Sequence, residues 1–113
     1  MSKGFYQYIA DERLKLLYSI VYSYWYFYDK SFLPQAIHVY TYKLIQERAI
    51  KDLWGDWFWT GMGPHSYKLG YELVLLSSQG LLEKVCIGNG VLCGLLTLPN
   101  YAPKPEKLYL AML

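Results

Sequence analysis

The chain has 113 residues, which is enough for one domain with one core. Hydrophobic residues make up 54% of it, against about 45–50% in typical globular proteins, so the composition excludes a disordered chain. The formal net charge is only +2 and the pI is about 8.4, below the value of about 9 that is typical of dedicated nucleic-acid domains. We therefore treat residues 1–113 as a single domain whose charge permits contact with nucleic acid without requiring it.

Aromatic residues are unusually abundant: 13 Tyr, 4 Trp and 4 Phe make up 19% of the chain. Tyr and Trp combine an apolar body with a polar group, and they favour half-buried positions and interfaces. A short chain also has a high surface-to-volume ratio. We therefore expect a second copy to cover part of the aromatic surface in a homodimer.

Neither a targeting signal nor a membrane span is expected. Residues Met1 to Tyr6 contain no apolar signal core. The charge-free run 16–28 is shorter than the roughly 20 residues that a spanning helix needs, and the charge-free run 85–103 contains several Gly and Pro residues that break helices. The sequence therefore predicts a cytoplasmic protein without membrane contact.

A first helix is predicted from about Asp11 to Lys30. Apolar residues recur at helical spacing on one side of it, and the opposite side is apolar as well. A helix that is apolar all round is buried on more than one side, so its second face is predicted to form the dimer seam. The candidate seam residues are Tyr18, Tyr22, Trp25 and Tyr26.

Two further helices and a hairpin follow. The second helix begins near Pro34 and ends at about Arg48. A short strand, 57–60, and a turn, 61–64, precede the third helix, 66–79, in which Leu69, Leu73 and Leu76 line one stripe with Tyr67, Tyr71 and Val74 beside it. A hairpin turns at Asn89-Gly90, and residues 107–113 form either a last strand or a short docking segment. The predicted fold class is α+β, three helices followed by a β-hairpin.

The stretch Trp59 to Tyr67, with Leu73 and Gly80-Leu81-Leu82-Glu83, forms a pattern: an aromatic residue, a Gly-Pro-x-Ser turn, a helix and a Gly-Leu-apolar-Glu step into a hairpin. This pattern resembles the winged-helix domains of archaeal small regulators and is similar to the Panacea-type antitoxin domain, over about residues 56–95. The resemblance implies a winged helix-turn-helix fold that binds either DNA or a protein. The hairpin tip, 87–91, departs from the DNA-binding pattern because it contains no Lys or Arg.

If the protein binds DNA, the third helix is expected to enter the major groove. The start of this helix could meet phosphates or base edges, since its backbone N–H groups favour anions, whereas Glu72 opposes a nearby phosphate. A mildly basic region after the second helix could hold further phosphates, or its cations could form plain ion pairs with Glu47 and Asp52. The candidate DNA-binding residues are His65, Ser66, Lys68, Lys43, Arg48 and Lys51.

The sequence indicates no enzyme, cofactor or metal site. His38 and His65 are far apart in the sequence and lack carboxylates at the spacing of a metal or catalytic box. The tryptophan-rich stretch 54–59 lacks surrounding positive charge, so it is expected to fill the core or a dimer interface. Cys86 and Cys93 face each other across the predicted hairpin at a widely spaced pair, which disfavours a disulfide, and reduced thiols are expected.

These observations predict a winged-helix protein that binds double-stranded DNA as a homodimeric transcriptional regulator. The alternative is a winged-helix module for protein–protein interaction, antitoxin-like or encoded by a virus or plasmid, that does not bind DNA. The low charge, the uncharged hairpin tip and the excess of aromatic residues favour this alternative.

Overall fold

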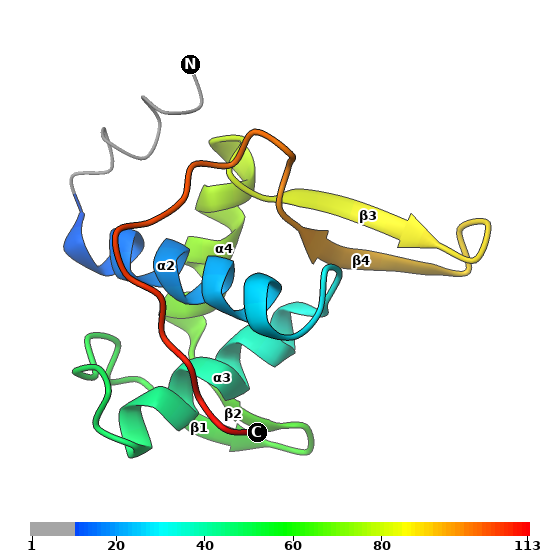
Figure 1. Ribbon diagram of the computed structural model, residues 1–113. Helices are drawn as coiled ribbons and strands as arrows, with labels where there is room; N and C mark the ends of the chain where they lie inside the picture. Colours follow the sequence, from blue (N-terminus) through cyan, green and yellow to red (C-terminus); the bar gives the residue numbers. More distant parts are fainter. Residues whose placement is uncertain (1–10) are drawn as a thin grey trace.

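The computed structural model describes residues 11–113, and the predicted lack of a signal core at residues 1–6 lies outside this part (Figure 1). The order of elements is α2 (Glu12–Phe27), α3 (Pro34–Gln46), β1 (Phe58–Thr60), β2 (Gly63–His65), α4 (Tyr67–Ser78), β3 (Glu83–Ile87) and β4 (Leu92–Thr97). Residues 11–113 thus contain three helices followed by a hairpin. The predicted α+β class is confirmed, and the arrangement is compatible with a winged helix.

Local sequence signals set the helix starts. The Oδ1 atom of Asp11 accepts the N–H groups of Arg13 and Leu14 at the start of α2, so it satisfies two donors that the helix leaves free. Pro34 occupies the first turn of α3, where its missing N–H costs no helical hydrogen bond. Ser66 caps α4 in the same way as Asp11 caps α2. The starts of all three helices therefore follow from the sequence.

The short strand β1 was predicted, but its partner β2 was not. Trp59 pairs with Pro64 in this two-stranded antiparallel ladder. A Pro removes a ladder hydrogen bond and is tolerated at the edge of a sheet, which a two-stranded ladder provides. The predicted turn at 61–64 is thus the tip and second strand of a small hairpin.

The hairpin of β3 and β4 turns where the sequence predicts. Asn89 and Gly90 both have positive φ, 56° and 87°, as a type I′ turn requires, and Ile87 pairs with Leu92. Phe32, between α2 and α3, exchanges two backbone hydrogen bonds of 3.0 and 2.7 Å with Leu96 of β4, and these attach the base of the hairpin to the helices. Beyond this base the hairpin projects from the helices (Figure 1).

The prediction of reduced cysteines is wrong, because Cys86 and Cys93 form a disulfide across this hairpin. Their Cα atoms are 4.1 Å apart, closer than the wide pair that regular alternation gives. The reason is an irregularity in the ladder: Val85 pairs with Leu95 but Ile87 pairs with Leu92, so β4 contains one extra residue. A regular ladder would have kept the two cysteines at the wide spacing.

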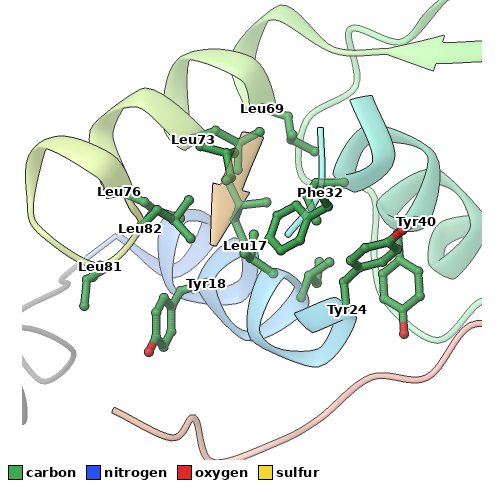
Figure 2. Packing of buried hydrophobic residues seen from close by; sticks show 14 of the residues in the cluster. Leu17, Tyr18, Tyr24, Phe32, Tyr40, Leu69, Leu73, Leu76, Leu81 and Leu82 are labelled. Carbon is green, nitrogen blue, oxygen red and sulfur yellow. The ribbon is translucent and has the colours of Figure 1, made fainter. Parts of the chain in front are cut away.

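The core lies where the three helices meet the base of the hairpin. Figure 2 shows Leu69, Leu73 and Leu76 of α4 with Leu17 of α2 and Leu82 before β3, all of them buried. The leucines of α4 recur at i, i+4 and i+7, so one side of the helix enters the core as the spacing predicts. No helix within residues 11–113 is long and apolar enough to cross a membrane.

Residues 98–113 contain neither helix nor strand, and they run over α2 and α3 (Figure 1). Of the two predictions left open for residues 107–113, a last strand is wrong and a docking segment is confirmed. We call residues 102–113 the docking segment. Ala111 within it is completely buried and belongs to the main core cluster.

Candidate interaction surface on helix α4

The start of α4, where DNA contacts were predicted, is closed by the protein's own groups. Ser66 is buried; its Oγ accepts the Leu69 N–H at 3.1 Å and donates to Oδ1 of Asp56 at 2.5 Å. Oδ2 of Asp56 accepts the N–H of Lys68 at 3.1 Å. Two first-turn N–H groups are therefore already bonded, and Ser66 does not face the solvent.

Asp56 also places a negative charge at this helix end. Its partial burial acts to raise the pKa of the carboxyl, but the hydrogen bonds from Ser66 and from the Lys68 N–H outweigh burial and lower the pKa below its ordinary 3.8. The carboxylate is therefore ionised at neutral pH and complements the positive end of the helix dipole. A phosphate at the same place would be repelled.

His38 and His65 lie together, although they are distant in the sequence. Their rings stack with centroids 4.0 Å apart and an interplanar angle of 13°. The Nδ1 atom of His38 accepts the N–H of Ser66 at 3.1 Å. His65 is held on its other side by Gln35, whose Nε2 donates to the Pro64 carbonyl, so that its Oε1 faces Nδ1 of His65 at 3.2 Å. The two rings therefore position β2 against α3.

His38 is buried, on the side of α3 that also carries the buried Thr41. Burial, and then the charge of His65, lower the pKa of His38 to about 4, although Asp56 acts in the opposite direction. His38 is therefore neutral at neutral pH, as an acceptor for the Ser66 N–H must be. Its spacing of three residues from buried Thr41 is the sequence signal that indicates this position.

The six predicted DNA-binding residues come from β2 and the start of α4, and from the end of α3 and the chain just beyond it. Lys68 is exposed, and its Nζ lies 3.3 Å from the Trp54 carbonyl oxygen. Lys43, Arg48 and Lys51 lie in the last turn of α3 and just beyond it. The start of α4 lies beside the first half of α3, at His38, so Lys43 is about 7 Å further along that helix.

The outer side of α4 is apolar and exposed. Tyr67, Tyr71 and Val74 recur at i, i+4 and i+7, and their exposed fractions are 71%, 64% and 56%. We call these three residues the α4 stripe. The sequence placed them beside the core side of the helix, but only Leu69, Leu73 and Leu76 enter the core with Glu72. The ring of Phe58 lies 4.9 Å from that of Tyr67 and extends the α4 stripe onto β1.

A groove of about 240 Å³ lies beside the α4 stripe. Val74 belongs to both features, and Lys84 is the single charged side chain in the wall of the groove. The other walls come from α4, the start of α3 and β4. The groove is lined by Pro34, Gly70, Leu73, Val74, Ser77, Lys84, Gly94 and Leu96.

Glu72 does not face the solvent, so the prediction that it opposes a phosphate bound at this helix is wrong. Its side chain is 4% exposed; Oε2 lies 2.6 Å from Nε of Arg13, and Oε1 accepts Nε1–H of Trp54 at 2.7 Å. Glu72 is three residues after Leu69 and four before Leu76, and this spacing places it on the buried side. The exposed side of α4 is consequently free of carboxylates.

The tryptophan-rich stretch divides between the core and the surface. Trp54 is buried, as the expectation of a core role requires. Trp57 is half-buried and Trp59 is 68% exposed, and both rings contact Tyr42 on α3. One residue of the group therefore fills the core, while Trp59 stands at the surface.

The four predicted seam residues of α2 have different surroundings. Tyr18 is completely buried, and its hydroxyl donates to the Pro103 carbonyl, so the chain's own docking segment covers it. Tyr22 and Trp25 are half-buried and their rings lie 5.5 Å apart. Tyr26 is 53% exposed. Tyr18 is thus not available to a second copy while the segment is docked.

Residues 11–113 contain no group of three or more His, Cys, Asp or Glu side chains that could hold a metal ion. The sequence matches no protein-family model, and neither a curated protein nor a solved structure is detectably similar to it. The resemblance to winged-helix regulators therefore rests on the residues of this chain alone, and the candidate surface is defined by its geometry.

Proposed function

We propose that the chain is a protein-binding domain whose α4 stripe and adjoining groove take an apolar segment of a partner protein. The exposure of Tyr67, Tyr71 and Val74 on one side of a single helix is the observation that carries the proposal. Apolar side chains gathered on an exposed face mark interaction sites, and tyrosines supply large contact area with few rotatable bonds. This is the antitoxin-like alternative of the sequence analysis.

The charges around the α4 stripe indicate the chemistry of the partner. Lys68 is exposed next to Tyr67, and Lys84 lies in the wall of the groove. The one acidic residue of α4, Glu72, is buried against Arg13. Because Lys68 and Lys84 border an apolar face and α4 itself presents no exposed carboxylate, the complementary segment carries an apolar anchor flanked by Asp or Glu.

The test is selection from a displayed library of random peptides, followed by fluorescence anisotropy with the peptides selected. We expect apolar peptides with acidic flanks, and we expect Tyr71→Glu to weaken their binding by about tenfold or more, since it puts a charge in the contact. Tyr26→Glu is the matched control, because it makes the same change at an exposed tyrosine of another helix. Equal effects of the two substitutions would rule out the α4 stripe as the binding surface.

DNA binding is the second candidate, favoured by the order of elements and by the exposed position of Lys68 at the start of the third described helix. The capped helix start, Asp56 and the uncharged hairpin tip oppose it. Anisotropy of a labelled mixed-sequence duplex at two salt concentrations decides between the candidates. We expect no binding at low salt; binding that weakens steeply with salt and with Lys68→Ala would favour DNA instead.

A further inference from the structure

The helices α2 and α3 hold the docking segment much as a receptor holds a peptide ligand. Hydroxyl groups from α2, α3 and the turn between them hold its main chain: Tyr18 donates to the Pro103 carbonyl, and Tyr28 donates to the Ala111 carbonyl. Ser23 Oγ accepts the N–H of Tyr109 at 2.8 Å. These hydrogen bonds are made to the main chain of the segment and not to its side chains.

Tyr40 is the central contact of this site. Its hydroxyl donates to the Tyr109 carbonyl at 2.5 Å and accepts the Ala111 N–H at 3.1 Å. With Ser23, it satisfies main-chain groups on alternate residues, 109 and 111, as a neighbouring strand would. Tyr40 is itself buried against α2, where its ring meets Tyr24 edge-on. These side chains of α2 and α3 form a second groove, the α2–α3 groove, and their hydrogen bonds fix the position of the segment along it.

The connection to the docking segment is short and exposed. Residues 99–102 form a turn in which the Ala102 N–H donates to the Pro99 carbonyl at 3.0 Å, with Asn100 and Tyr101 at its exposed tip. Prolines at 103 and 105 keep the following chain extended. Extended, residues 103–113 reach about 36 Å, while the longest dimension of the molecule is 35 Å. The segment is long enough to reach an adjacent molecule.

We infer that two copies of this chain exchange their docking segments, each segment lying in the α2–α3 groove of the other copy. Every contact that holds the segment in one chain forms equally between two, which is the condition for exchange at low cost. The docked segment also leaves Leu110, Met112 and Leu113 exposed, at 52%, 71% and 62%. This apolar surface gives a second copy additional area to cover. The inference concerns a surface apart from the α4 stripe and does not depend on the proposed function.

The first test is light scattering of the full chain over a range of concentrations. We expect a monomer–dimer equilibrium, whereas a chain that lacks residues 103–113 and carries the free peptide 102–113 in its groove has no tethered segment to exchange and stays monomeric. Tyr40→Phe removes the same two hydrogen bonds from the closed monomer and from each groove of the exchanged dimer, so it leaves the equilibrium nearly unchanged. A full chain that stays monomeric, or a truncated chain that still forms dimers with the peptide bound, would overturn the inference.

A second variant keeps the groove and the segment intact and changes only the connection between them. Deletion of Asn100 and Tyr101 removes the two central residues of the turn, so the chain can no longer reverse direction between Pro99 and Ala102, and the segment is directed toward a second copy. We expect the dimer share to rise, and a free peptide of residues 102–113 to return the protein to monomers. A monomeric deletion variant, or a dimer that the peptide leaves intact, would contradict exchange.

Discussion

Glu72 is the residue whose position most changes the interpretation of the surface. A buried carboxylate is costly unless it is paired, and here Arg13 and Trp54 satisfy both of its oxygens. The pairing joins α2, the loop before β1 and α4. Because this acid is withdrawn from the outer side of α4, no carboxylate of this helix remains there to repel an acidic partner.

We predict that Arg13→Ala lowers the free energy of unfolding by about 2 kcal/mol, since it leaves a buried carboxylate without its cation. The partial exposure of Arg13 keeps the loss below that of a fully buried pair. Urea unfolding measures the change, and the double substitution with Glu72→Gln gives the coupling. A loss below about 0.5 kcal/mol would mean that water replaces the arginine.

His38 makes stability depend on pH. Its pKa falls from 6.5 in the unfolded chain to about 4 in the folded protein, chiefly through burial. Between these values the unfolded chain binds more protons, so stability is complete above pH 6.5 and is lost as the pH falls toward 4. The shift corresponds to a loss on the order of 3 kcal/mol. Protonation also removes the acceptor of the Ser66 N–H.

We predict that His38→Asn flattens this pH dependence, because Asn offers an acceptor near the place of Nδ1 but does not titrate. Urea unfolding between pH 4 and 7 gives the slope for both proteins. His65→Asn is the comparison variant, since it removes the charge next to His38 while leaving His38 to titrate. An unchanged slope in His38→Asn would assign the pH dependence to carboxylates.

At the residue scale, sequence reasoning located caps and turns better than it located buried polar groups. Pro34 and Asn89-Gly90 act through their own backbone, so their roles are visible locally. The positions of His38 and Glu72 depend on partners 27 and 59 residues away, His65 and Arg13. Neither residue was predicted to be buried, because only the fold supplies the partners that make burial acceptable.

At the scale of elements, the β3–β4 hairpin is where the structure departs most from the prediction. Its turn and the pairing of Ile87 with Leu92 follow from Asn89-Gly90, whereas the only local signal of the extra residue in β4 is Gly94, whose φ is 89°. The disulfide that results is typical of an oxidising compartment or of the cytosol of hyperthermophiles. It also closes a projecting hairpin whose tip has few neighbours to hold it.

We predict that thiol alkylation of the denatured protein modifies neither cysteine before reduction and both after it, as mass spectrometry can show. Replacing both with Ser is expected to destabilise the hairpin by about 2 kcal/mol, from the entropy of closing so short a loop. Hydrogen exchange is expected to rise at residues 85–93 and not in α4. Thiols that react without reduction would restore the original expectation.

At the scale of the whole molecule, the order of the three helices and the β3–β4 hairpin was predictable, because each has its own periodicity and its own breaks. The docking segment was not, since residues 98–113 have no periodicity and are placed by hydroxyl groups of α2 and α3. The predicted seam on α2 was a reasonable deduction from its two apolar sides. In the structure the docking segment covers Tyr18, which is part of that seam.

We predict that removing residues 103–113 lowers the melting temperature and increases binding of a hydrophobic dye, because Tyr18 and Tyr40 lose their cover. The free peptide 102–113 is expected to reverse both effects. Differential scanning fluorimetry measures the first effect and dye fluorescence the second. A truncated chain as stable as the full one would show that the docked segment contributes nothing to the fold.

The hydroxyl groups that hold the docking segment grip its main chain, and this leaves its outward side chains free to change. Lys104 and Leu110 are exposed on the docked segment. A fluorophore or affinity handle attached at either position would travel with the segment without entering the groove. Labels at these two positions would therefore report when the segment leaves its groove and to which molecule it binds next.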